Sequence, residues 1–239
     1  MIDLLIPCYN EDKNVRQLVM QWGEIVKNNR DLSVYFIDNG STDNTRKIIK
    51  NELQKINDEN LKIIVLEENV GYGAGIKKGI SMTSNTYISW THADLQINSK
   101  DVNNLICKYI SNKEKDNQLF MGKRENRNLF DQFFTLMMSF FSFLFTGYYL
   151  KDINSQPKIF PRRIVTDHDT LPNDFNIDLA ILLAARKNNI DIKLNNLIFH
   201  KRSFNKSKGG GSILGKLKLS ISTLIFIISY SIRRFDFRK

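Results

Sequence analysis

Two polar residues with metal-ligand chemistry, Asp94 and Gln96, lie two positions apart just after a short apolar run that ends at Trp90. In an extended chain residues i and i+2 share a face, so both side chains are expected to point into one crevice. Carboxylate and amide oxygens suit Mg²⁺ or Mn²⁺, which also take phosphate oxygens and water as ligands. The same residues fit an ordinary helix-capping turn, so this pair alone leaves both interpretations open.

His92 stands two residues before the aspartate. Its imidazole is either a third ligand, more compatible with Mn²⁺ than with Mg²⁺, or a nucleotide contact, or a residue that only lines the site. The other histidines, His168 and His200, are distant in the sequence, and no cysteine lies close by. These spacings argue against zinc.

Three further segments carry polar or glycine-rich chemistry. Asp38 in DNGSTD (38–43) suits hydrogen bonds from a base or ribose, or a simple turn. GYGAG (71–75) is similar to a phosphate-cradling loop, but its spacing matches neither the dinucleotide fingerprint nor a P-loop. KSKGGGS (206–212) puts lysines beside glycines, which favours a lid over phosphates above a plain linker.

Short apolar runs alternate with helical periodicity over the first 121 residues, which predicts an α/β fold with a mostly parallel sheet. The expected strands are 3–7, 34–38, 62–67, 86–90 and 118–122, and the expected helices are 11–28, 43–56, 72–82 and 99–112. Ser41, Thr42 and either Asn98 or Ser99 are the predicted N-caps. A further amphipathic helix is expected over 173–189, with Asp178 near its start.

The polar segments follow consecutive predicted strands. Residues 7–11, 38–43, 68–75 and 91–96 each come directly after one of the first four. In open α/β sheets ligands bind beyond the carboxyl ends of the strands. We therefore expect all four segments at one edge, around a site the size of a nucleotide.

The net charge of +10 is concentrated at the C-terminus, because residues 199–239 contain ten lysines and arginines and one acid, Asp236. This basic region brackets an apolar run, 219–232, and a second run, 133–150, has eight aromatic residues and no charge. The pairing favours an anionic membrane surface and argues against nucleic acid. Both runs fall short of the roughly 20 residues of a confident span, so interfacial helices are expected. Two cysteines without CxxC spacing and no signal peptide predict a reduced, cytosolic setting.

Taken together, IPCYNE, DNGSTDNT, NVGYGAGIKKGI and HADLQ resemble, in order and spacing, the motifs of the inverting family 2 glycosyltransferases of GT-A fold. Within that family the chain looks closest to the polyprenyl-phosphate glycosyltransferases, and the resemblance covers residues 1–212. It implies a Rossmann-like GT-A domain over 1–212, with an apolar interfacial helix inserted at about 129–150. Residues 213–239 then form a basic, apolar helix that associates with the membrane.

The resemblance also assigns site residues. Pro7, Tyr9 and Glu11 match the motif that embraces the nucleotide base, Asn39 replaces the second acid of DDGS, and His92 replaces the first aspartate of DxDLQ. The expected donor-binding residues are Pro7, Tyr9, Glu11, Asp38, Asn39, Gly73, His92, Ala93, Asp94, Gln96, Arg202, Ser207 and Lys208. The expected metal ligands are Asp94, Gln96 and His92.

The catalytic residues implied are Asp94, Arg124, Asp152 and Lys158. Arg124 matches a phosphate-binding arginine, and KDINSQPKIF (151–160) matches the family's DxxSGFR/K element, with Gln156 and Pro157 in place of Gly-Phe. Arg202, Ser207 and Lys208 match a late loop that closes on the donor.

The implied reaction moves a hexose from a GDP- or UDP-linked donor to a polyprenyl phosphate, with inversion and with Mg²⁺ or Mn²⁺. It takes place at the cytoplasmic face of the membrane, on a peripheral or shallowly inserted protein. Two alternatives stay open. In the first alternative the acceptor is a sugar hydroxyl, with Asp152 or Asp178 as general base. In the second the chain binds nucleotide-sugars without catalysis. The sugar, the base and the oligomeric state are not fixed by the sequence.

Overall fold

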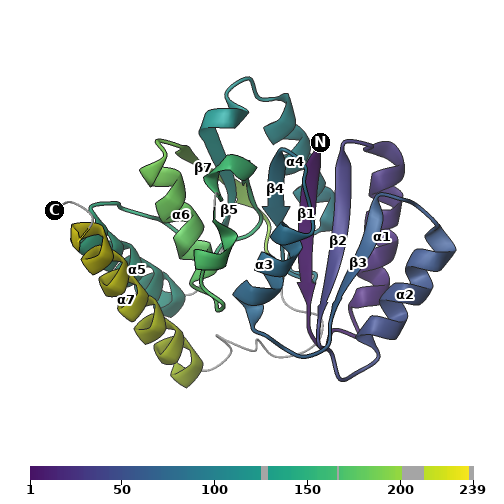
Figure 1. Ribbon diagram of the computed structural model, residues 1–239, viewed down its shortest axis with the longest axis horizontal. Coiled ribbons are helices and arrows are strands. Elements are labelled where there is room, and N and C mark those ends of the chain that lie inside the picture. Colours follow the sequence, from purple (N-terminus) through teal and green to yellow (C-terminus); the bar gives the residue numbers. More distant parts are fainter. Residues whose placement is uncertain (125–128, 166, 201–212, 237–239) are drawn as a thin grey trace.

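The computed structural model describes residues 1–124, 129–165, 167–200 and 213–236. Within them, seven strands form one sheet in the order β3-β2-β1-β4-β6-β5-β7, with helices on both faces (Figure 1). The strands are β1 (Ile2–Cys8), β2 (Leu32–Asn39), β3 (Leu61–Leu66), β4 (Tyr87–Trp90), β5 (Gln118–Arg124), β6 (Lys158–Pro161) and β7 (Asp191–Leu197).

The sheet is mostly parallel. β1 pairs in parallel with β2 and β4, and β2 pairs in parallel with β3. β6 lies antiparallel between β4 and β5, and β5 pairs in parallel with β7. The expected α/β fold with a mostly parallel sheet is confirmed.

The predicted helices are present. They are α1 (Val15–Asn28), α2 (Thr45–Ile56), α3 (Tyr72–Ser81), α4 (Ser99–Ser111) and α6 (Ile177–Lys187). α3 and α4 begin at the predicted residues, and α1, α2 and α6 begin two to four residues later than predicted. Asn98 caps α4 by accepting from the Lys100 amide, as predicted. Ser41 and Thr42 do not cap α2, whose N-cap position is Asn44. Their side chains hydrogen-bond to Asn10 instead, so they join two loops.

β6 and β7 were not expected from the sequence. β6 is only four residues long and begins at the end of the polar segment KDINSQPKIF. β7, DIKLNNL, is an edge strand with mostly polar or half-exposed residues, so it lacks an apolar run. Their pairing with β5 is a tertiary effect that overrides weak local preference.

Two hydrophobic clusters pack on opposite faces of the sheet. Successive side chains of a strand alternate between faces, so Leu4 and Ile6 lie in the cluster with α1, α2 and α4. Leu5 lies in the cluster with α3 and α6. This sandwich holds the carboxyl ends of β1 to β4 at one edge, the lower edge in Figure 1.

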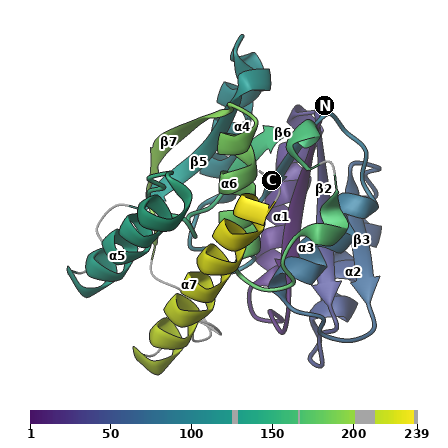
Figure 2. The ribbon, with the colours of Figure 1, turned by 60° about the vertical axis from the view of Figure 1, so that its left-hand side comes forward.

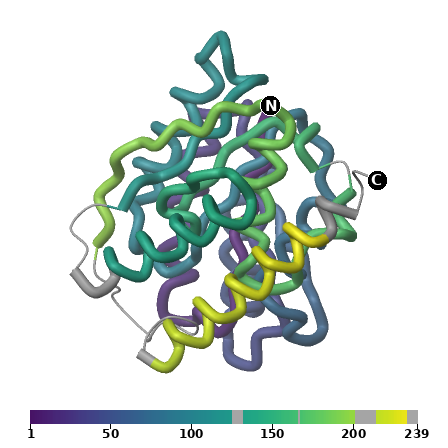
Figure 3. Tube along the Cα trace, turned by 90° about the vertical axis from the view of Figure 1, so that its left-hand side faces the viewer, coloured from purple at the N-terminus to yellow at the C-terminus, as the bar shows by residue number. Residues whose placement is uncertain are grey.

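Two apolar helices stand beside the sheet. α5 (Leu129–Thr146) and α7 (Ile213–Asp236) pack side by side although they are far apart in sequence (Figures 2 and 3). The Ser231 hydroxyl donates to the Phe145 carbonyl at 2.7 Å. Ile227 is fully buried in the cluster that contains α6, so α7 is joined to the core.

Candidate active site

The four polar segments meet at the carboxyl edge of β1 to β4, as the parallel pairing requires. The loop after β1 is bonded to the loop after β2. The Asn10 amide donates to Ser41 Oγ at 3.0 Å and the Glu11 amide donates to Thr45 Oγ1 at 2.7 Å. These bonds hold the loop after β1 and the loop after β2 in place relative to each other.

Pro7, Tyr9 and Glu11 lie half-buried at the end of β1 and in the loop after it. Glu11 Oε2 accepts from the Asn14 side chain at 2.7 Å, which orients the carboxylate. Their predicted contact with a nucleotide base stays a prediction.

Asp38 is fully buried near the carboxyl end of β2. It is paired with Arg46, a residue that the sequence did not single out. Asp38 Oδ2 accepts from Arg46 Nε at 2.7 Å, and Oδ1 accepts from the Ser41 amide at 3.2 Å. Arg46 Nη2 also donates to the Leu66 carbonyl at the end of β3. Asp38 therefore both stabilises the turn after β2 and forms an ion pair with Arg46. A nucleotide bound at this position would contact the ion pair and not a lone carboxylate.

Asn39 connects β2 to the glycine-rich segment. Its Nδ2 donates to the Gly71 carbonyl at 3.0 Å and to Asn69 Oδ1 at 3.2 Å, while its Oδ1 accepts from the Val70 amide at 3.3 Å. Because a carboxylate only accepts, an aspartate here would have no proton to give the Gly71 carbonyl. This geometry gives a physical reason for asparagine at this position.

Gly73, in the first turn of α3, packs against another backbone segment. A Cβ placed on it would lie 2.3 Å from the Pro172 carbonyl oxygen and 2.5 Å from the Asp174 carbonyl oxygen. The next amide, of Ala74, donates to the Asn173 carbonyl at 3.0 Å. The structure thus accounts for this glycine by a close approach of backbone, and its predicted contact with the donor is untested.

The rim around Asp94 is a turn and not a continuation of β4, which ends at Trp90. Leu95 has a left-handed φ of 55°, and the Gln96 amide donates to Asp94 Oδ1 at 3.1 Å. The expected extended geometry is therefore wrong, because the chain turns back on itself. Gln96 Nε2 donates to the His200 carbonyl at 3.3 Å, and Ala93 is buried in the core.

The chemistry of this rim fits a divalent cation that takes its other ligands from a diphosphate and water. Asp94 offers a carboxylate, Gln96 an amide and His92 an imidazole. Among the described residues there is no cluster of three or more His, Cys, Asp or Glu side chains placed to hold a metal.

His92 is the first of three rings in consecutive contact, tilted against Tyr72, which is stacked on Phe175. Its ring centroid is 5.6 Å from that of Tyr72, and the Tyr72 ring stacks on Phe175 at 4.8 Å and 16°. Burial raises the pKa of the Tyr72 phenol well above its ordinary value, and the charges of Asp178 and Asp94 raise it further. Tyr72 is therefore a neutral wall of the site beside Asp94.

Arg124 and Asp152 form a charge-assisted pair. Arg124 Nη2 and Nε donate to Asp152 Oδ1 at 2.6 and 2.9 Å, and the Arg124 amide donates to Oδ2 at 2.8 Å. The Asp152 carboxylate therefore accepts on both oxygens from one residue. This fixes the guanidinium at the end of β5.

Lys158 is fully buried and its ammonium is paired with Asp178. Nζ donates to Asp178 Oδ1 at 2.9 Å and to the Ser155 carbonyl at 2.8 Å. Burial lowers the pKa of Lys158, and the neighbouring carboxylate of Asp178 opposes that shift. The expected role of Lys158 in catalysis stays a prediction, and in this structure its charge neutralises an internal carboxylate.

Sequence reasoning missed the residues that connect these groups: Tyr72, Trp90, Gln156 and Phe175. The available signals were a tyrosine inside the glycine motif and the glutamine that departs from the family element. Arg202, Ser207 and Lys208, the expected lid residues, lie outside the described residues.

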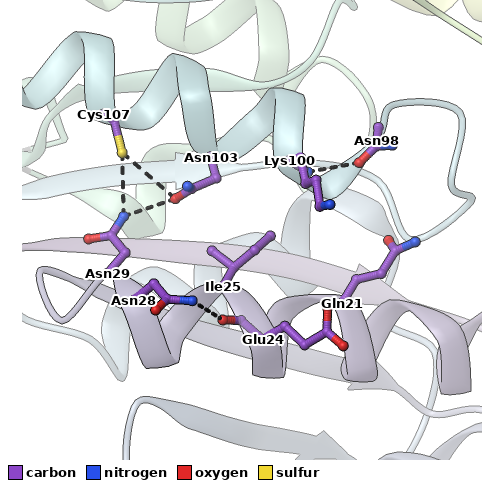
Figure 4. Close-up of a pocket in the computed structure, with 9 residues that line it drawn as sticks. All are labelled: Gln21, Glu24, Ile25, Asn28, Asn29, Asn98, Lys100, Asn103 and Cys107. Carbon is purple, nitrogen blue, oxygen red and sulfur yellow. Dashed lines mark hydrogen bonds between the residues drawn. The ribbon is translucent and has the colours of Figure 1, made fainter.

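A polar groove separate from these residues lies between α1 and α4 (Figure 4). Several of its amides bond to one another or to neighbouring groups, for example Asn29 Nδ2 to Asn103 Oδ1 at 2.9 Å. None of the nine residues drawn is a predicted site residue.

Comparison with known proteins agrees with this arrangement. Residues 3–166 match the model of glycosyl transferase family 2. The chain therefore belongs to that family, and the matched range includes every described site segment from the end of β1 to Lys158.

Among curated proteins, the chain is 26% identical over 212 residues to a dolichyl-phosphate β-glucosyltransferase of Dictyostelium discoideum, covering 80% of this chain and 64% of that protein. It is 27% identical over 216 residues to a UDP-N-acetylglucosamine–dolichyl-phosphate N-acetylglucosaminyltransferase of Methanococcus voltae, covering 80% and 82%. The chain thus spans somewhat less than two thirds of the Dictyostelium relative.

Among solved structures, glucosyl-3-phosphoglycerate synthase of Mycobacterium tuberculosis, in complex with Mn²⁺ and uridine diphosphate, superposes with a TM-score of 0.70. The match covers 96% of this chain and 80% of that one at 15% identity. It confirms the GT-A fold. Another complex of the same enzyme contains Mg²⁺ and uridine diphosphate.

Proposed function

We propose that this chain transfers a hexose from a UDP- or GDP-linked donor to a polyprenyl phosphate, with inversion at the anomeric carbon. Both curated relatives described above carry dolichyl phosphate in their names. The family membership supports the sugar transfer, and these relatives support the class of acceptor.

One observation carries the choice of a phosphate acceptor over a hydroxyl. A hydroxyl acceptor needs a general base, and both carboxylates that the sequence offered for that role are held in ion pairs, Asp152 by Arg124 and Asp178 by Lys158. A phosphate monoester, with a second pKa near about 6, is largely ionised at neutral pH and needs no base. The locked carboxylates therefore favour the phosphate.

The residues of the site then take the following roles. Arg124, oriented by Asp152, neutralises the acceptor phosphate. Asp94 and Gln96, with His92 beside them, would hold Mg²⁺ or Mn²⁺, which would supply positive charge to stabilise the departing nucleoside diphosphate. Pro7, Tyr9, Glu11 and Asp38 hold the nucleotide, and Arg202, Ser207 and Lys208, which lie outside the described residues, are the remaining predicted donor contacts.

We place the protein at the anionic cytoplasmic face of a membrane. α5 and α7 expose large apolar side chains, here called the apolar face: Phe133, Leu136, Phe140, Phe143, Leu144, Leu214, Leu217, Ile221, Ile225 and Ile232. Lys218 is exposed on α7, and the sequence adds arginines at its end. Such a pairing of apolar and basic residues suits the interface of an anionic bilayer.

The same helices support a position in the interface over a crossing. Leu214–Ile232 is long and apolar enough to span a bilayer by length and composition. However, Ser222 near its middle donates to Asp174 Oδ2 at 3.2 Å, and Asn176 Nδ2 donates to Ser222 Oγ at 3.0 Å. A crossing would carry an exposed carboxylate beside the site into hydrocarbon, which is costly. The helix therefore lies along the membrane surface.

A transfer assay tests the proposed function. Purified protein in undecaprenyl-phosphate vesicles is given radiolabelled UDP- and GDP-sugars with Mg²⁺ or Mn²⁺, and label in the organic extract is counted, with undecaprenol as control acceptor. We expect label only with the phosphate. Asp152→Asn should raise the KM for the acceptor and leave the acidic limb of the pH profile of kcat unchanged. A loss of several thousandfold in kcat with intact donor binding would indicate a base and a hydroxyl acceptor, and donor binding without transfer to any acceptor would indicate a non-catalytic protein.

A further inference from the structure

One buried oxygen atom accepts three hydrogen bonds from two segments that are far apart in the sequence. Asp178 Oδ1, in the first turn of α6, accepts from Gln156 Nε2 at 2.8 Å, from Lys158 Nζ at 2.9 Å and from Trp90 Nε1 at 3.0 Å. The Asp178 side chain is 1% exposed. The carboxylate thus joins the end of β4 to the segment that carries Asp152.

A short path leads from this atom to the arginine assigned to the acceptor phosphate. Lys158 Nζ also donates to the Ser155 carbonyl at 2.8 Å, and the Ser155 amide donates to the Asp152 carbonyl at 2.8 Å. The Asp152 carboxylate then holds Arg124. Removing the Asp178 charge therefore leaves the Lys158 ammonium without its carboxylate partner. That ammonium is bonded to the turn 152–155, whose Asp152 orients Arg124.

A second path leads to the metal rim. Gln156 Nε2 also lies 3.3 Å from the Tyr72 hydroxyl, and the Tyr72 ring contacts His92. Trp90 is the last residue of β4, four positions before Asp94. The segment 152–158 and the metal rim at Asp94 are thus both connected to the Asp178 carboxylate. Gln156, which stands where the resemblance expects glycine, makes one of these connections.

Stability alone is a weak reason for such an arrangement. Replacing a buried ion pair by apolar residues of similar volume is often neutral or stabilising, whereas removal of one partner leaves a buried charge without compensation. Buried hydrogen bonds do, however, restrict the geometry of the groups they connect, and Asp178 Oδ1 has three donors.

We propose that Asp178 is a positioning residue of the transfer reaction: through Lys158 and Gln156 it holds the segment 152–158, and so Arg124, in register with the rim at Asp94. This inference rests on the proposed function, because it assigns Arg124 to the acceptor phosphate. Asp178 itself touches no reacting atom.

The chain offers a matched control. Asp3 is also a fully buried carboxylate, and it accepts from Arg162 Nη2 at 2.8 Å and from the Asn85 amide at 2.9 Å, at the start of β1. Asp3→Asn and Asp178→Asn remove the same charge from the two ends of the sheet. Both should lower the melting temperature, but only Asp178→Asn should alter acceptor binding.

The test uses the full chain labelled with ¹⁵N-tryptophan, which gives two indole signals, from Trp22 and Trp90. A Trp22→Phe variant assigns them. Farnesyl phosphate is titrated in the presence of Mg²⁺ and UDP, with farnesol as control. In the wild type we expect the Trp90 indole signal to move on saturation. In Asp178→Asn we expect that movement to be lost and the Kd for farnesyl phosphate to rise about 10- to 100-fold, as for other supporting residues of a site, with UDP affinity within about twofold.

The double variant Asp178→Asn/Lys158→Met covers the case in which the single variant does not fold, because it removes both charges together. It should regain stability but keep the weakened acceptor binding. The inference is overturned if either folded variant binds farnesyl phosphate like the wild type, or if Asp3→Asn weakens binding equally. Absence of binding by the wild type itself is a different result, which overturns the proposed function and the inference with it.

Discussion

Asn39 uses both ends of its amide where an aspartate has only acceptors. It donates to the Gly71 carbonyl and accepts from the Val70 amide, so it fixes the start of the glycine-rich segment relative to β2. The departure from the family motif at this position is thus joined to the conformation of its neighbour, because Gly71 has a φ of 96° that favours glycine.

Replacing Asn39 by the aspartate of the family motif should therefore lower the stability of the folded protein. Asn39→Asp removes the donor and places a carboxylate against the Gly71 and Asn69 oxygens, and we expect a loss of about 1–3 kcal/mol in the free energy of unfolding. Urea unfolding measures it, and Asn51→Asp, at an exposed position of α2, is the control. An unchanged midpoint for Asn39→Asp would show that the bond to Gly71 contributes nothing.

The types of the site residues were predictable from the sequence, but their partners were not. The Asp94–Gln96 pair and Asp152 stand out by motif. Nothing local says that Arg46 pairs with Asp38, or that Lys158 is buried against a residue 20 positions away. Ion pairs between elements depend on how helices pack, which short-range periodicity does not report.

At the scale of elements, two glycines of α3, Gly73 and Gly75, look alike in the sequence but have different surroundings in the structure. Gly73 faces the backbone of residues 172–174, whereas a Cβ on Gly75 would lie 3.4 Å from Asn39 Nδ2, an ordinary contact. Both belong to GYGAG, and of these two it is Gly73 that allows two backbone segments to meet.

Alanine substitutions should distinguish the two. Gly73→Ala forces the loop at 172–174 away from α3 and should cost about 1–3 kcal/mol of unfolding free energy. Gly75→Ala adds a good helix former where there is space and should change stability by no more than about 1 kcal/mol, in the stabilising direction. Chemical denaturation of both variants gives the comparison, and equal losses would contradict the assigned contact.

Strands and helices of the amino-terminal half were predictable because each strand is a compact apolar run, and β1, β2 and β4 are buried along almost their whole length. β6 and β7 lack such a run, since β6 is short and β7 is polar along an edge. The turn at Asp94 was missed for a related reason, because a single left-handed residue, Leu95, has no signal in its side chain.

At the scale of the molecule, the apolar face should bind vesicles rich in phosphatidylglycerol. Phe140 and Ile225 are 55% and 60% exposed, so Phe140→Glu/Ile225→Glu should leave the fold intact. Full burial of one such side chain is worth about 1.5–3 kcal/mol, so loss of half the lower figure at both positions should lower partitioning about tenfold.

Co-sedimentation measures this partitioning, and Met20→Glu, at an exposed apolar residue of α1, is the control. High salt should weaken binding by the wild type, because lysines and arginines contribute through anionic lipid. Equal binding by the double variant and the wild type would place the membrane contact elsewhere.

The pairing of α5 with α7 also constrains how the protein is made. α5 ends at Thr146 and α7 begins at Ile213, 67 positions later. At about 5–20 residues per second, α5 leaves the ribosome roughly 3–13 s before its partner exists. During that interval the side of α5 that will meet α7 is uncovered, so the nascent chain has a period in which early contact with lipid or a chaperone would prevent aggregation.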